Sequence, residues 1–189
     1  MEQNTAALIL DNKPDTRAET YPFAAAIYTP KTQDRSALNV FAREMAAAGV
    51  RVGGLVQEVL RDDDGRLRGM NAVDVETGAR APIKAPLPDK PQGEVCLLDT
   101  AALTDTSAVL RRNIADRLDL IIVEKFGDQE QRGAGLSDEI FAAIADGIPL
   151  LIAVPQSARE VWDERTGSMG ETLEFEVAAF HRWWERVSG

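Results

Sequence analysis

A glutamate and a lysine that follow a buried strand open the segment richest in chemical groups. The apolar run Leu120–Val123 is followed by Glu124 and Lys125, and Gly133-Ala134-Gly135 comes shortly after. An ammonium group at the end of a strand can hold an anion. Two glycines can turn backbone N–H groups toward an oxyanion. The pattern therefore predicts an oxyanion site in which Lys125 supplies charge and residues 133–135 supply N–H donors.

Each of these features also has a purely structural interpretation. Lys125 can form an ion pair with Glu124 or Glu130. The glycine turn can serve only as a loop that needs positive φ. The sequence leaves both alternatives open.

The loop after the strand FAAAIY (23–28) has the length of a phosphate-binding loop but not its glycines. A working loop has the pattern G-x-x-x-x-G-K-[ST], in which glycine N–H groups surround the phosphates. Here Thr29 and Asp34 replace both glycines, and Arg35-Ser36 stands for the Lys-Ser pair. We therefore expect Arg35 to be a charge partner and Ser36 a hydroxyl donor for an anion. Asp34 would place a carboxylate where phosphates lie, and an ordinary strand-to-helix loop is the alternative.

Further polar residues lie where strands end. Thr32, Asp99, Glu124 and Glu130 are the groups that could serve a nucleotide or a metal ion. Asp99 follows the strand ending in CLL and would hold magnesium if a metal binds, with a helix cap as the alternative. The type of metal, if any, is left open.

Composition and charge limit the classes of function. The formal net charge is −10, which disfavours nucleic acid as a partner because phosphate backbones require clustered Lys and Arg. The single cysteine, Cys96, excludes an internal disulfide, and no segment has the pattern of a signal peptide or a membrane span. We therefore expect a cytoplasmic protein that does not bind a membrane.

Apolar patterning predicts alternating strands and helices, which is typical of an α/β domain with a mainly parallel sheet flanked by helices. Strands are expected over residues 23–28, 50–59, 94–98, 120–123 and 148–154. Helices are expected over residues 36–48, 104–117, 137–147 and 170–187. Residues 58–80 contain two turns and predict a small antiparallel hairpin excursion, and the proline-rich residues 81–93 predict a surface connection.

The expected organisation has three parts. Residues 1–20 form a flexible leader, residues 21–169 form the α/β domain, and residues 170–189 form an amphipathic helix. That helix packs on the domain or on a partner, and a homo-oligomer is one form that this packing can take. Ligands of parallel sheets bind beyond the carboxyl ends of the strands, so the candidate residues above are expected at one edge.

Two segments carry a resemblance to a known group. EVLRDDDGRLRGMNAVDVETGAR (58–80) and LDLIIVEKFGDQE (118–130) are similar in order to features of the thermophile-type cancer-related nucleoside-triphosphatases. The resemblance implies a P-loop NTPase-like fold. It puts Glu124 at the magnesium-linked position and Lys125 at the position of the acid that activates water, while Gly127 and Glu130 are retained. The hydrolytic motifs are therefore degenerate.

A second resemblance is closer. GVRVGGLVQE (49–58), CLLD (96–99), VEKFGDQEQRGAGLSDEI (123–140) and GIPLLIAVP (147–155) resemble the bacterial domain-of-unknown-function family 2478. Members are often encoded beside molybdate-uptake genes, so the resemblance implies a role in molybdenum or tungsten handling.

Three hypotheses follow. The first is a protein that binds a small anionic ligand, molybdate or tungstate, on a P-loop fold without hydrolytic machinery. The second is a divergent Mg-dependent phosphohydrolase that binds a nucleotide and uses Glu124 and Asp99. The third is a regulatory or scaffold protein without a small ligand. The sequence does not decide whether the protein is an enzyme.

Overall fold

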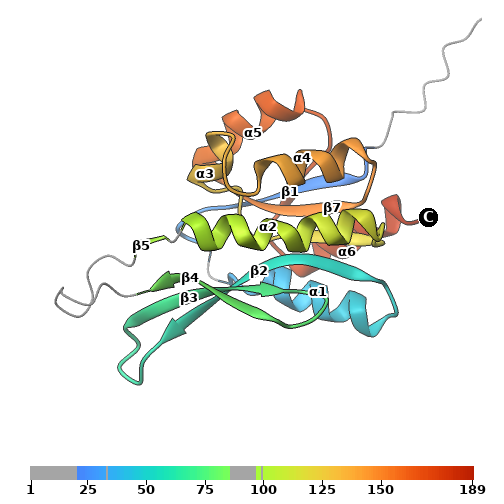
Figure 1. Ribbon diagram of the computed structural model, residues 1–189. Helices are drawn as coiled ribbons and strands as arrows, with labels where there is room; N and C mark the ends of the chain where they lie inside the picture. Colours follow the sequence, from blue (N-terminus) through green and yellow to red (C-terminus); the bar gives the residue numbers. More distant parts are fainter. Residues whose placement is uncertain (1–20, 33, 86–96, 99) are drawn as a thin grey trace, which may run out of the picture.

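The computed structural model describes residues 21–32, 34–85, 97–98 and 100–189 (Figure 1). The predicted leader of residues 1–20, together with Cys96 and Asp99, lies outside the described residues.

One mixed sheet forms the centre of the described structure, and eight strands contribute to it in the order β5-β4-β3-β2-β6-β7-β1-β8. Strands β2, β6, β7, β1 and β8 run parallel to one another, whereas β3, β4 and β5 continue the sheet from β2 in antiparallel fashion. Their bounds are β1 Phe23–Tyr28, β2 Val52–Arg61, β3 Leu67–Asp74, β4 Arg80–Ala85, β5 Leu97–Leu98, β6 Leu120–Val123, β7 Leu150–Pro155 and β8 Glu171–Glu174. The α/β class with a mainly parallel sheet flanked by helices and an antiparallel excursion is confirmed.

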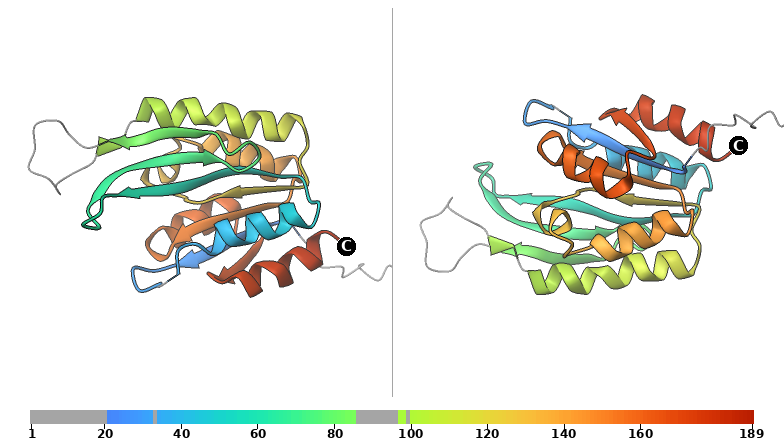
Figure 2. Two further views of the ribbon diagram at one scale, coloured as in Figure 1. Left: turned by 90° about the horizontal axis from the view of Figure 1, so that it is seen from below. Right: turned by 90° about the horizontal axis from the view of Figure 1, so that it is seen from above.

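Helices cover both faces of this sheet (Figures 1 and 2). Helices α2, α4 and α5 lie on one face and α1 and α6 on the other. A short helix, α3, and a 3-10 turn (Gln156–Ala158) complete the described elements. The helical bounds are α1 Ala37–Ala47, α2 Thr100–Ala115, α3 Asp128–Gln131, α4 Ser137–Ala145, α5 Arg159–Thr166 and α6 Val177–Val187.

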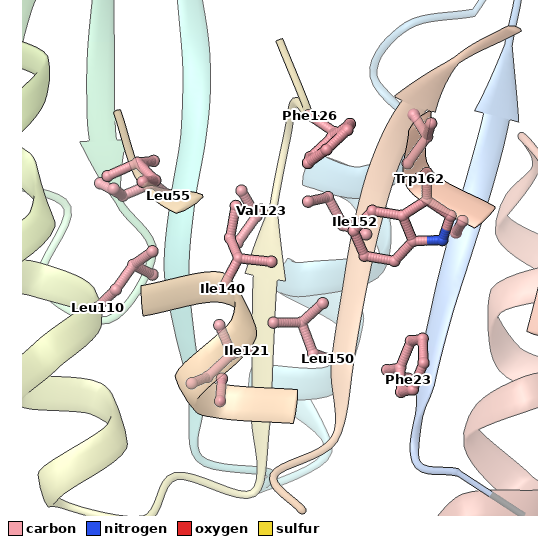
Figure 3. Close-up of a cluster of buried hydrophobic side chains, with 14 of the residues drawn as sticks. Phe23, Leu55, Leu110, Ile121, Val123, Phe126, Ile140, Leu150, Ile152 and Trp162 are labelled. Atoms are coloured by element: carbon pink, nitrogen blue, oxygen red, sulfur yellow. The ribbon is translucent and has the colours of Figure 1, made fainter. Parts of the chain in front are cut away.

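The side chains on the two faces of the parallel strands belong to two separate hydrophobic cores. In β1, Phe23 and Ala25 belong to the core under α2, α4 and α5, while Ala24 and Ala26 belong to the core under α1 and α6. A strand that is buried on both faces needs a continuous apolar run, which explains why FAAAIY has no polar alternation. Figure 3 shows the first core, where the rings of Trp162 and Phe126 pack in a T-shaped arrangement.

Gly54 allows β2 to lie close to β6. Its φ is +114°, and a Cβ atom there would overlap the carbonyl oxygen of Ile122. The backbone N–H of Gly54 donates to Oδ1 of Asn113 on α2 at 2.8 Å. The glycine therefore serves strand packing and a buried hydrogen bond rather than a ligand.

The structure corrects the helix predicted from Gly170. Residues Glu171–Glu174 form β8, which pairs in parallel with β1, and α6 begins only at Val177. The segment ETLE alternates, with Leu173 buried between more exposed neighbours, and this period of two is that of a strand. Within α6, Phe180 and Trp183 are buried in the second core.

The surface connection predicted over residues 81–93 is also wrong in its described part. Residues 80–85 form β4, which pairs with both β3 and β5. The prolines suggested a loop, but cross-strand pairing outweighs that local preference. Helices α3 and α5 were not predicted, because neither has a long apolar period.

Candidate functional site

A cavity of about 400 Å³ lies where β6 and its pairing with β2 end, beside the antiparallel extension. It is bounded by the middle of β2 (residues 55–57), by the carboxyl end of β6, by β3 and β4, by Thr106 of α2 and by the segment between β6 and α4. This is the edge at which parallel sheets bind ligands. The cavity is the candidate site.

Two lysines line this cavity without a carboxylate partner. Lys125 follows β6 and is exposed, while Lys84 comes from β4 and is half-buried. Neither ammonium group forms an ion pair with any residue that the structure describes. The alternative interpretation, an ion pair from Lys125 to Glu124 or Glu130, is therefore not formed in the described structure. The same lining also contains Glu124, Asp128 and Glu130, so the positive charge that favours an anion is confined to the surroundings of these two lysines.

Glu124 is the carboxyl group at the end of β6 that lines the same cavity. It is half-buried, and one of its oxygens accepts a short hydrogen bond from the backbone N–H of Gln57. Burial raises the pKa of Glu124 above its ordinary value, and the Gln57 bond and the charge of Arg35 oppose this rise. The raised pKa favours the neutral form of this group.

Glu130 stabilises the segment between β6 and α4. The residue is only 4% exposed; Oε2 accepts the N–H of Gly127 at 2.8 Å and Oε1 accepts the N–H of Leu136 at 3.1 Å. One carboxylate thus ties the start of α3 to the residue before α4. Its part as a nucleotide or metal ligand gains no support from this geometry, because both oxygens already have protein donors.

The turn at residues 133–135 does not form an open oxyanion nest. The N–H of Gly133 donates to the carbonyl oxygen of Glu130 at 3.0 Å, and the N–H of Ala134 donates to that of Gln129 at 2.9 Å. Gly135 has a φ of +61°, and a Cβ atom there would overlap Oε1 of Glu130. The turn folds around a carboxylate of the protein, so its glycines serve backbone conformation and close packing.

The loop between β1 and α1 is closed by its own side chains. The N–H of Thr29 donates to Oγ1 of Thr32 at 3.0 Å. Asp34 Oδ1 accepts the N–H of Ser36 at 2.8 Å and its hydroxyl at 2.7 Å. These Ser36 bonds lower the pKa of Asp34. Asp34 therefore takes the donors of Ser36 that a phosphate would use, and the expectation that Ser36 donates to an oxyanion is not supported here.

Arg35 lies on this loop and does not line the cavity. Its guanidinium carbon lies 3.5 Å from the ring centre of Tyr28 and 5.7 Å from that of Phe175. It is exposed and forms no ion pair within the described ranges. Its positive charge still acts on Glu124, where it opposes the rise in that carboxyl group's pKa. Arg35 is thus a neighbouring cation of the site rather than part of its wall.

The structure therefore divides the predicted residues into three places. Lys125, Glu124 and Glu130 border the cavity; Thr32, Arg35 and Ser36 lie on the β1–α1 loop; and residues 133–135 form a closed turn. Sequence reasoning missed Lys84, because it lies in the stretch expected to be a surface connection. Its signal was a lysine beside an apolar residue, Ile83, and that signal is weak.

Two kinds of site are absent from the part of the chain that the structure describes. It contains no group of three or more His, Cys, Asp or Glu side chains placed to hold a metal ion. None of its helices combines the length and apolar character needed to cross a bilayer.

The chain is similar to a curated protein of molybdenum import. It is 41% identical over 165 residues to the "Molybdenum import ATP-binding protein ModC 2" of Bradyrhizobium diazoefficiens. The match covers 87% of this chain but only 18% of the relative's length. No solved structure matches the chain significantly.

A family profile matches most of the chain. It spans residues 23–183, from the first residue of β1 to the middle of α6. The stretch includes the cavity, both strand-to-helix loops and every parallel strand of the described sheet. The chain therefore belongs to the family described as "Protein of unknown function (DUF2478)".

Proposed function

We propose that this chain is an oxyanion-binding domain that takes molybdate or tungstate in molybdenum handling. The observation that carries the proposal is the pair of lysines, Lys84 and Lys125, which line one cavity without an ion-pair partner among the described residues. In a protein of net charge −10, two such cations at a sheet edge mark a local site for a negative ligand.

The chemistry of the cavity supports a tetrahedral oxyanion. The two ammonium groups supply strong, charge-assisted donors. The side-chain amide of Gln57, which also lines the cavity, can add a neutral donor. Glu124 repels an anion when it is ionised, and burial raises the pKa of this carboxyl group above its ordinary value.

The ligand class has a separate line of support. The curated relative is named for molybdenum import, and this chain corresponds to 18% of it. We extend that printed role to this chain only as far as the ligand. The proposal includes a cytoplasmic location, which agrees with a sequence that has a single cysteine.

Calorimetric titration of the full chain tests the proposal. Molybdate and tungstate are titrated first, with sulfate, phosphate and Mg-ATP as comparison ligands. Lys84→Ala and Lys125→Ala should each weaken molybdate binding about 10-fold to 100-fold, because each removes a charge-assisted hydrogen bond of about 1.5–3 kcal/mol. Molybdate binding that both variants leave unchanged contradicts the proposal.

A matched control separates a local effect from a change in net charge. Arg43 is exposed on α1 and donates to the carbonyl oxygen of Asn39 on its own helix. Arg43→Ala removes one positive charge away from the cavity, so molybdate affinity should change less than about 2-fold. A loss as large as that of Lys125→Ala would mean that overall charge, and not the cavity, holds the ligand.

The relative's name also favours a second candidate, a Mg-dependent nucleotide phosphohydrolase. That relative is described as ATP-binding, and Glu124 stands at the end of the strand where such an enzyme needs an acid. Turnover of ATP or GTP that Glu124→Gln abolishes would support this enzyme. Heat from Mg-ATP alone would favour it over the oxyanion domain, and no heat from any ligand would favour the scaffold hypothesis.

A further inference from the structure

The cavity is larger than an inorganic oxyanion requires. Four oxygen atoms displace roughly four waters, which is on the order of 120 Å³ at about 30 Å³ for each water. The cavity holds about 400 Å³. That volume lies in the range of pockets for small organic molecules, about 300–1,000 Å³.

The remaining space has an apolar wall. Met70 and Ala72 of β3, Ile83 of β4 and Leu136 before α4 all line the cavity. Ala72, Ile83 and Leu136 are also members of the first core, so this wall is continuous with the interior of the domain. Met70 is half-buried and offers most of the accessible surface of this wall, because Ala72, Ile83 and Leu136 are only 1–5% exposed. An apolar group that covers accessible apolar surface gains about 25 cal/mol for each Å².

The cations and the apolar wall are adjacent. Met70 on β3 is paired in register with Lys84 on β4, which places a cavity-lining cation beside the apolar strand. Lys125, by contrast, enters from the end of β6. A ligand with a charged head and an apolar body matches this division of the walls.

We propose that the natural ligand of this cavity is an organic oxyanion, with a tetrahedral head of the phosphate type held by Lys84 and Lys125 and a compact apolar body, such as a ring, against Met70, Ala72 and Ile83. This inference rests on the proposed oxyanion function and names the class of ligand for the same site. It does not use the β1–α1 loop, whose Ser36 donors are taken by Asp34. Molybdate would then occupy only the head position.

The test compares inorganic oxyanions with phosphates that carry an organic group. Inorganic phosphate, methyl phosphate, phenyl phosphate and molybdate are titrated calorimetrically into the full chain. We expect phenyl phosphate to bind at least about 10-fold more tightly than inorganic phosphate, because the ring covers apolar wall. Methyl phosphate should fall between them. This series uses the unaltered protein, so it does not depend on how a variant folds.

Variants then show which residues account for the tighter binding of phenyl phosphate. Met70→Gln keeps the length of a half-buried side chain but adds an amide, so it should remove most of the ratio by which phenyl phosphate binds more tightly than inorganic phosphate. Lys84→Ala should weaken both ligands in parallel. Met169→Gln is the matched control, because Met169 is 43% exposed and does not line the cavity.

The outcomes distinguish this inference from the proposed function. Equal affinity for phenyl and inorganic phosphate, both dependent on the lysines, overturns the organic body and keeps the oxyanion site. Lysine-dependent binding of phenyl phosphate without any binding of molybdate supports the organic ligand and overturns the molybdate role. No binding of any anion overturns both.

Discussion

The two loops that follow β1 and β6 differ in what closes them. The β1–α1 loop is largely exposed, and Asp34, Thr29 and Thr32 close it through bonds to residues two or three positions away. The segment after β6 is closed by Glu130, a buried carboxylate whose bonds reach Gly127 and Leu136. Both follow the carboxyl end of a parallel strand, yet only the second borders the cavity.

The loop that has the length of a phosphate-binding loop is therefore not the loop that lies at the cavity. The β1–α1 loop keeps the length of a phosphate loop, but its acid takes the donors of Ser36. The β6–α4 segment places Lys125 at a cavity and is stabilised by buried bonds that do not involve Lys125. A ligand site needs side chains held by their surroundings, and the second loop has that support.

The largest expected effect comes from breaking the buried carboxylate. Glu130→Ala leaves the N–H groups of Gly127 and Leu136 without their acceptor in a buried place, so the free energy of unfolding should fall by about 3–5 kcal/mol. Urea denaturation followed by circular dichroism measures it. Asp34→Ala, on the exposed loop, should cost far less.

The conservative variant sharpens this contrast. Glu130→Gln keeps one acceptor oxygen, so its free energy of unfolding should lie between that of the wild type and that of Glu130→Ala. Equal losses for Glu130→Ala and Asp34→Ala would mean that the two loops are equally dispensable.

The next effect concerns the glycine turn. Gly135→Ala should lower the free energy of unfolding by about 3 kcal/mol, because it adds overlap with Glu130 to the cost of a left-handed residue. Gly133→Ala has a similar φ, but its Cβ meets Arg165 only at an ordinary 3.6 Å, so about 1 kcal/mol is expected. Thermal unfolding of the pair measures the difference. An indistinguishable pair would contradict the packing of Glu130 under Gly135.

A smaller effect compares the cations of the two loops. Lys125→Ala should weaken oxyanion binding about 10-fold or more, whereas Arg35→Ala should weaken it less than about 3-fold, because Arg35 acts only through its charge at a distance. Titration with tungstate at low and high salt measures both. The Arg35 effect should vanish at high salt. A larger loss of affinity from Arg35→Ala than from Lys125→Ala would indicate that the anion binds at the β1–α1 loop and not in the cavity.

The smallest expected effect is on the pH dependence of stability, because the pKa values of Asp34 and Glu124 are shifted in opposite directions. Ser36 lowers the pKa of Asp34, so Asp34 contributes stability above the ordinary carboxyl range and loses it as the pH falls through its lowered pKa. Burial raises the pKa of Glu124, so ionisation of Glu124 reduces stability as the pH rises from the ordinary range through its raised pKa.

Carboxyl carbon chemical shifts followed by NMR across the acid range measure both midpoints. Glu124→Gln should gain stability over the wild type above the ordinary carboxyl range and match it below. A Glu124 midpoint at or below the ordinary value would contradict the burial of this group.

Much of the fold could be predicted because its signals are local. The runs at 23–28 and 120–123 are continuous and apolar, and both match β1 and β6 residue for residue. The strand at 171–174 was missed because four residues of period two precede a strongly amphipathic helix, and only pairing with β1 makes them a strand.

The site was less predictable because it depends on long-range pairing. Lys125 was found from its place after a strand. Lys84 reaches the cavity only through the pairing of β4 with β3, which the prolines concealed. Gly133 and Gly135 suggested an anion nest, and nothing local shows that Glu130 fills that place.

The most direct test of the central claim is to locate tungstate in crystals grown with a stoichiometric amount of the ion, using anomalous scattering. The account predicts a single strong peak in the cavity, within contact distance of the ammonium groups of Lys84 and Lys125. A peak only at the Thr29–Ser36 loop beside Arg35, with none in the cavity, would contradict it.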